Sequence, residues 1–247
     1  MRNVLNIKIV LFLSITFAYA QYPSGKSILE KIDQNMSSTN RIVTSKMIIH
    51  GSRNIRTIES RSWVQGTDKS FTEYLSPVRE KGTKMLKLED NLWMYSPSTD
   101  RTIQISGHML RQSVMGSDLS YEDMLEDPKM ENNYDAEVLS EETIDERSCW
   151  VLLLTAKNAD VAYQTRKIWV DQERYVPLKE ELFAKSGKLL KRLTLSNITE
   201  IEGRWFPFEM TFKDMLKTGE GTKFVIEEIQ FDKIIPAYLF SKAALRK

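Results

Sequence analysis

Most of the chain alternates apolar and polar residues in short runs, which is the pattern of half-buried β-strands. The clearest run lies within residues 204–216, where Phe206, Phe208, Met210 and Phe212 alternate with more polar neighbours. A strand with this pattern buries one face and exposes the other to water.

Thirteen such runs predict thirteen strands. They cover residues 41–50, 54–65, 69–76, 83–88, 91–96, 101–106, 134–144, 147–156, 163–171, 176–184, 188–200, 204–216 and 222–232. The links between most of them are short, which favours antiparallel neighbours because a parallel crossover needs about a dozen residues or more. Since a twisted open sheet rarely exceeds about ten strands without curling or splitting, we expect an α+β fold. Its core is a strongly curved, half-closed antiparallel β-barrel with helices covering the concave face.

Three segments depart from the alternation and predict helices. Ser27 and Glu30 have the spacing of a capping box, which predicts a helix start. The apolar face of this first helix consists of Ile28, Leu29, Ile32 and Met36. Ser120 precedes Asp123 by the same spacing, which predicts a short helix that is either a lid or an ordinary connection. Residues 238–246 have apolar residues at helical spacing and predict a terminal helix.

The first twenty residues have the three parts of a secretory signal peptide. Arg2 and Lys8 form a basic start, an uncharged apolar run follows, and Ala18-Tyr19-Ala20 is a cleavage site of small residues. The uncharged run is too short to span a membrane, which takes about 20 residues. We therefore expect residues 1–20 to be cleaved and residues 21–247 to form a single periplasmic domain. With Cys149 as its only cysteine, far from the cleavage site, the mature protein is expected to carry no lipid anchor.

The composition argues against several classes of partner and chemistry. The 35 basic and 34 acidic residues are interspersed, so no basic patch marks a nucleic-acid interface. We also expect the protein to be a monomer. His50 and His108 lie far apart without the neighbours of a zinc site, and no Gly-x-Ser-x-Gly elbow is present. Five acids at 118–127 lack the spacing of a calcium loop and are interpreted as a solvated helix face. We therefore predict a protein that is not an enzyme and uses no cofactor or metal.

Large apolar residues on the first group of strands indicate a ligand wall or a filled core. The candidate cavity residues are Trp63, Phe71, Met85, Trp93, Tyr95 and Ile103. The candidate lid residues are Met109, Leu110, Met115, Leu119, Tyr121 and Met124. A barrel-like sheet can hold an apolar ligand, and methionine provides an adaptable wall.

Several motifs resemble the periplasmic lipoprotein carriers of the LolA type. Asn91-Leu92-Trp93-Met94-Tyr95-Ser96-Pro97 resembles their turn and aromatic strand, and Gly116-Ser117-Asp118-Leu119-Ser120-Tyr121-Glu122-Asp123 resembles a signature of the LolA-like lipoprotein-sorting branch. In the second half, Ile168-Trp169-Val170-Asp171 and Gly203-Arg204-Trp205-Phe206-Pro207 fit the same branch.

The resemblance implies a LolA/LolB-like half-barrel whose hydrophobic cavity shields acyl chains of lipoproteins or other lipids between the inner and outer membranes. It also implies an inner-membrane transporter as donor and an outer-membrane acceptor. In the carriers proper an arginine on an early strand latches the lid, but neither Arg61 nor Arg79 lies in that motif context. The resemblance therefore supports lipid binding, whereas lipoprotein transfer also requires a latch that these arginines do not provide by motif. The alternative is an envelope sensor of the same fold, which binds a lipid or protein partner without transfer.

Overall fold

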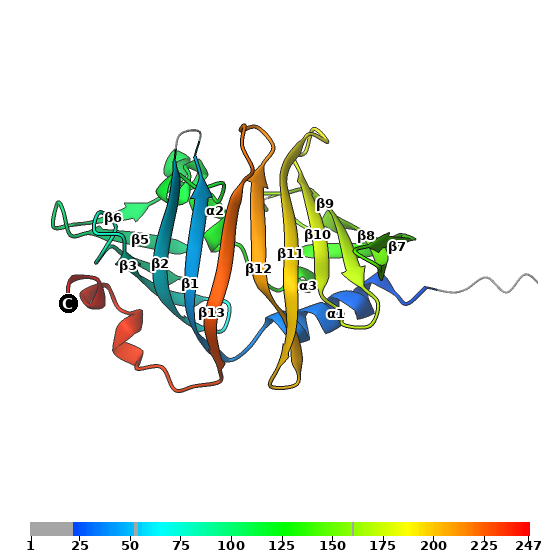
Figure 1. The fold of residues 1–247 in the computed structure, drawn as a ribbon, viewed down its shortest axis with the longest axis horizontal. Coiled ribbons are helices and arrows are strands. Elements are labelled where there is room, and N and C mark those ends of the chain that lie inside the picture. The colour runs from blue at the N-terminus through cyan, green and yellow to red at the C-terminus, as the bar shows by residue number, and fades with distance from the viewer. Residues whose placement is uncertain (1–21, 52–53, 160) are drawn as a thin grey trace, which may run out of the picture.

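The structure is a computed structural model that describes residues 22–51, 54–159 and 161–247, so the expected leader, residues 1–20, lies outside it. Thirteen strands form one sheet in the order β6-β5-β4-β3-β2-β1-β13-β12-β11-β10-β9-β8-β7 (Figure 1). The order runs from one edge strand to another, and every neighbouring pair is antiparallel. The sheet is therefore large and does not close.

The strand bounds match the alternation in the sequence to within two residues at every end. The strands are β1 (Asn40–His50), β2 (Ile55–Gln65), β3 (Lys69–Ser76), β4 (Lys84–Leu88), β5 (Asn91–Ser96), β6 (Arg101–Ile105), β7 (Tyr134–Ile144), β8 (Arg147–Ala156), β9 (Thr165–Asp171), β10 (Pro177–Phe183), β11 (Leu189–Ile201), β12 (Arg204–Asp214) and β13 (Thr222–Phe231). The helices are α1 (Gly25–Met36), η1 (Gly107–Arg111), η2 (Val114–Gly116), α2 (Tyr121–Leu125), α3 (Met130–Asn133), η3 (Ala237–Phe240) and η4 (Lys242–Arg246).

Cross-strand pairing divides the side chains into two faces. On one half of the sheet, the inner face carries the cross-strand pair of Met47 with Ile58 and the pair of Met85 with Met94. On the other half it carries the pair of Leu152 with Ile168. The outer face carries the pair of Trp63 with Phe71 and the pair of Leu86 with Trp93. In Figure 1 the two ends of the sheet turn away from the central strands, and α2 and α3 lie behind those strands.

Helix α1 packs on the β7–β9 part of the inner face. Ile28, Leu29 and Ile32 are almost fully buried in a cluster with strand residues such as Trp150 and Leu152. The helix begins two residues before the predicted capping box, because the Ser24 side chain accepts a hydrogen bond from the Ser27 amide. At Gly25 a Cβ would lie 2.1 Å from the Ala136 carbonyl oxygen, so only glycine permits this close approach.

The 107–128 segment, which contains η1, η2 and α2, packs on the other half of the inner face. Tyr121 and Val114 are buried in a cluster with Met47, Ile58 and Met85. The predicted capping box is confirmed, since Ser120 and Asp123 exchange hydrogen bonds between side chain and backbone.

The C-terminal segment, residues 236–247, lies against the outer face instead. Leu245 and Ala244 are buried beside Phe71, Leu86 and Trp93. The predicted terminal helix is therefore two short 3-10 turns, η3 and η4, that follow the sheet surface. No helix of the described part of the chain has the length and apolar character that a membrane span requires.

Candidate functional site

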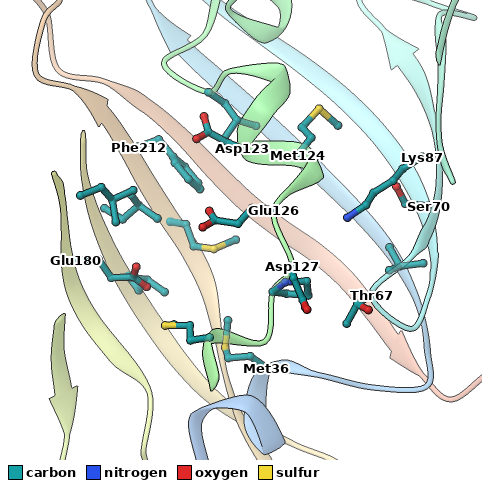
Figure 2. A pocket seen from close by; sticks show the side chains of 18 of the residues that line it. Met36, Thr67, Ser70, Lys87, Asp123, Met124, Glu126, Asp127, Glu180 and Phe212 are labelled. Atoms are coloured by element: carbon teal, nitrogen blue, oxygen red, sulfur yellow. The ribbon is translucent and has the colours of Figure 1, made fainter. Parts of the chain in front are cut away.

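A cavity of about 350 Å³ lies between the inner face and residues 119–130 (Figure 2). It is lined from both halves of the sheet, by β1–β4 on one side and by β9–β12 on the other. Its apolar lining consists of Met36, Val64, Leu119, Met124, Met130, Leu182, Leu193, Leu195, Met210 and Phe212. Its charged lining consists of Arg41, Lys69, Lys87, Asp123, Glu126, Asp127, Arg166, Glu180 and Lys191.

The apolar wall comes from strands β11 and β12, whose inward residues are paired across the ladder. Leu193 lies opposite Phe212, and Leu195 lies opposite Met210. The alternation of these two strands brings four large side chains onto one surface. Met36 enters from the end of α1, where the Asn35 side chain accepts a hydrogen bond from the Trp205 amide and so ties the helix to β12.

One ion pair connects α2 to strand β11. The Lys191 ammonium contacts the Asp123 carboxylate, and Tyr163 and Ser120 donate hydrogen bonds to the same group. Burial acts to raise the pKa of Asp123, but the charge of Lys191 and these hydrogen bonds lower it below its ordinary value. Asp123 is therefore an ionised anchor of the α2 segment on the sheet.

A second ion pair connects residue 126 to strands β9 and β10. The Arg166 guanidinium contacts Glu126 and lies 3.5 Å from Glu180, and it also covers the Tyr134 ring at 4.8 Å. Burial raises the pKa of Glu180, and Arg166 opposes that rise. Burial acts against the charge of Arg166, but the two carboxylates raise its pKa above the ordinary value. Arg166 thus stays charged in the interior and joins β9 to β10 and to the residue that follows α2.

A third contact holds the η2 turn. Arg56 on β2 donates a hydrogen bond of 2.7 Å to the Met115 carbonyl oxygen and lies 3.5 Å from Glu80. Neither arginine considered from the sequence makes such a contact: Arg61 covers the Trp63 ring, and Arg79 is 85% exposed.

Two other cations of the cavity have no carboxylate partner among the described residues. Arg41 on β1 donates to the Met36 carbonyl oxygen, and Lys87 on β4 donates to the Leu125 carbonyl oxygen. Burial lowers the pKa of both groups. Met36 and Leu125 are the last residues of α1 and α2, so each cation binds the end of a helix that borders the cavity.

None of the six predicted cavity residues lines this cavity. Trp63, Phe71, Trp93 and Tyr95 lie together on the outer face, packed against the C-terminal segment. Met85 and Ile103 lie on the inner face, where Met94 stands opposite both. The expectation that all six share the concave face is therefore wrong, because successive residues of a strand point to opposite faces and the predicted set mixed the two.

The six predicted lid residues do come together. Tyr121 is buried in the inner-face cluster, and the other five pack against it. Leu119 and Met124 also line the cavity.

The charged residues of the site were missed, although their positions hold a readable signal. Arg166 stands two residues before Ile168, and Lys191 two residues before Leu193, so each is in phase with the inward apolar residues of its strand. Glu180 stands two residues before Leu182 in the same way. A charge at an inward position of a strand indicates a buried partner.

The acids at 118–127 are not a solvated helix face. Asp118 accepts hydrogen bonds from Thr222 and the Asp214 amide, while Asp123 and Glu126 are the ion-pair partners described above. Cys149 is buried, and burial raises the pKa of its thiol to about 11. Within the described ranges no three His, Cys, Asp or Glu side chains group as metal ligands.

Comparison with known proteins gives the family. A protein-family model described as "-like: Uncharacterized protein" matches residues 66–247. A domain assigned to the outer membrane lipoprotein-sorting proteins, from Vibrio parahaemolyticus, is 26% identical and superposes with a TM-score of 0.79 over 90% of this chain and 98% of its own. The chain belongs to this LolA-like lipoprotein-sorting family.

Two further structures have the same fold as this LolA-like protein. A LolA superfamily protein from Nitrosomonas europaea is 26% identical, with a TM-score of 0.73 over 90% of this chain and 100% of its own. A DUF1329 family protein from Desulfovibrio piger is 24% identical, with a TM-score of 0.80 over 90% and 97% of the two chains. No curated protein matches the sequence.

Proposed function

We propose that this protein is a non-enzymatic periplasmic carrier whose cavity binds acyl chains of lipoproteins or other lipids for transfer between the inner and outer membranes. The observation that carries the proposal is the cavity between the inner face and residues 119–130, with its wall of leucine, methionine and phenylalanine. Its volume lies in the range of about 300–1,000 Å³ that is usual for small-molecule sites. Each buried CH₂ of a bound chain contributes about 0.8 kcal/mol.

In this proposal the helices cover the concave face of a half-closed barrel, and the 107–128 segment is the lid. Polar contacts hold this segment to several strands, and they come from Arg56, Lys87, Arg166, Lys191, Lys217 and the Asp118–Thr222 hydrogen bond. Its other contacts with the sheet are apolar, and many of those side chains are methionines, which adapt readily to a new neighbour. A lid held in this way can move without loss of the sheet. A membrane-embedded donor and an outer-membrane acceptor are the partners that such a carrier needs.

A cavity-filling variant tests the proposal. Leu193→Trp places a large side chain in the cavity, and we expect it to weaken binding of a fluorescent fatty acid to delipidated protein at least tenfold. Arg192→Trp is the matched control, because residue 192 is the next position of the same strand and its side chain is 40% exposed. Wild-type protein that binds no fatty acid or phospholipid probe at micromolar concentration would contradict the proposal.

A liposome assay separates the carrier from the envelope sensor. Mature protein is mixed with donor vesicles that contain a fluorescent lipid and with acceptor vesicles that lack it. A carrier moves the lipid to the acceptor at a rate proportional to protein concentration, whereas a sensor retains it.

A further inference from the structure

The charges that line the cavity do not balance. Lys191 is paired with Asp123, and Arg166 is paired with Glu126 and Glu180. The lining residues that remain are the cations Arg41, Lys69 and Lys87 and one acid, Asp127. The part of the cavity that borders β1–β4 is therefore positive.

Arg41 and Lys87 lie in one row on the inner face. The pairing runs from Arg41 to Val64, from Val64 to Ser70 and from Ser70 to Lys87, across four adjacent strands. With a strand spacing of about 4.8 Å, their Cα atoms are about 14 Å apart. The side chains of Arg41 and Lys87 are long enough to reach one anion between them from both sides. Burial lowers the pKa of Lys87, the charges of Asp127, Asp68 and Asp90 oppose that fall, and the charge of Arg41 adds to it.

The nearby acids are committed elsewhere. The Asp127 carboxylate accepts hydrogen bonds from the Lys129 amide and the Asn132 side chain, and Asp68 accepts one from Thr67. The described hydrogen bonds of Arg41 and Lys87 go to backbone carbonyl oxygens and not to either acid. A buried cation without a counter-charge is costly, and an anionic ligand removes that cost.

We propose that the cavity selects an anionic amphiphile, whose acyl chain lies on the β11–β12 wall and whose phosphate or carboxylate lies between Arg41 and Lys87. This inference rests on the proposed carrier function and adds the class of its cargo. Neutral lipids would fill the same apolar wall but leave the two cations unpaired.

Four probes test the preference on delipidated mature protein: a fluorescent fatty acid, its methyl ester, fluorescent phosphatidylglycerol and fluorescent phosphatidylcholine. We expect each anionic probe to bind about tenfold more tightly than its neutral or zwitterionic counterpart, in line with a charge-assisted hydrogen bond. Preference only within the fatty-acid pair assigns a carboxylate site, and preference only within the phospholipid pair assigns a phosphate site.

The double variant Arg41→Gln/Lys87→Gln should lose the preference while its affinity for the methyl ester stays within about twofold of wild type. Lys185→Gln/Lys188→Gln, which removes two exposed lysines of the β10–β11 turn, is the matched control. Arg41→Lys keeps the charge and should keep the preference, which guards against a variant that fails to fold.

Equal binding of the acid and the ester, and of the two phospholipids, by wild-type protein overturns the anion site and leaves the carrier in place. A preference that survives in the double variant also overturns it. Failure of all four probes to bind overturns the carrier proposal and the anion site together.

Discussion

Single buried charges decide how parts of this protein are joined. Asp33, on the buried face of α1, accepts hydrogen bonds from the amides of Met130 and Glu131 and so ties α1 to the start of α3. Burial raises the pKa of Asp33 from its ordinary value of 3.8 to about 6, and the two amide hydrogen bonds only partly oppose the rise. The carboxyl is thus neutral in the folded protein at a pH where it is ionised in the unfolded chain.

Asp33 should make stability depend on pH. The folded protein holds a proton that the unfolded chain releases between about pH 4 and pH 6, so the free energy of unfolding falls as the pH rises through this interval. We expect the fall to be about 1–2 kcal/mol, since solvent near the α3 turn screens part of the effect. Urea unfolding at pH 4 and pH 7 should show this fall in wild type and a smaller one in Asp33→Asn.

Glu30→Gln is the control, because Glu30 lies on the same helix but its side chain is 44% exposed. Equal pH dependence in wild type and Asp33→Asn would show that Asp33 does not hold the proton.

At the scale of elements, the 107–128 segment differs from its surroundings. Its helices are short, and 3-10 turns rarely extend further because their hydrogen-bond geometry is poorer than that of an α-helix. The segment is therefore held by its tertiary contacts rather than by its own helical stability. Tyr121 provides the apolar contact, and Asp123 provides the ionic one.

Removal of Lys191 should loosen this segment. Lys191→Met leaves the buried Asp123 carboxylate without its counter-charge, which costs about 3–5 kcal/mol. We expect faster hydrogen exchange of the amides at 119–126, with less change in the strands β7–β9.

The double variant Lys191→Met/Asp123→Asn should recover part of the loss, since the uncompensated charge is gone. Lys188→Met, at an exposed turn position, should change neither stability nor exchange. If the double variant loses as much free energy of unfolding as the two single variants lose together, Lys191 and Asp123 do not couple.

At the scale of the whole molecule, the sheet has two covered faces that serve different purposes. The inner face holds the cavity, whereas the aromatic part of the outer face is covered by the C-terminal segment. Lys242 lies over the Trp93 ring at 4.3 Å, and Lys84 donates a hydrogen bond to the Lys247 carbonyl oxygen. The strand that carries Trp93 is thus a structural support of the outer face.

Truncation of one side chain tests this role. Leu245 is fully buried on the outer face, so Leu245→Ala should weaken docking of residues 236–247 by about 2–5 kcal/mol. Proteolysis and hydrogen exchange of that segment should increase, while binding of the fatty-acid probe stays unchanged. Tyr238→Ala is the control, since Tyr238 is 59% exposed. Loss of probe binding in Leu245→Ala would connect the outer face to the cavity.

Local pattern was enough to predict much of this molecule. The thirteen strands, the antiparallel pairing of strands joined by short links and the α2 capping box follow from period-two alternation, link length and the Ser120–Asp123 spacing, all of which act over a few residues. The pairing of β1 with β13 does not, because the two strands lie at opposite ends of the sequence. The inward charges at Arg166, Glu180 and Lys191 could also have been found from the same alternation.

Tertiary structure decided which face of each strand turns inward and what covers it. Trp93 and Met94 are adjacent and both apolar, so no local pattern says which one faces the cavity side; the C-terminal segment, more than 140 residues away, buries Trp93. The cavity likewise joins Arg41 to Lys191 from opposite halves of the sheet. Such contacts depend on the curvature of thirteen strands together, because each strand contributes only a small part of the twist.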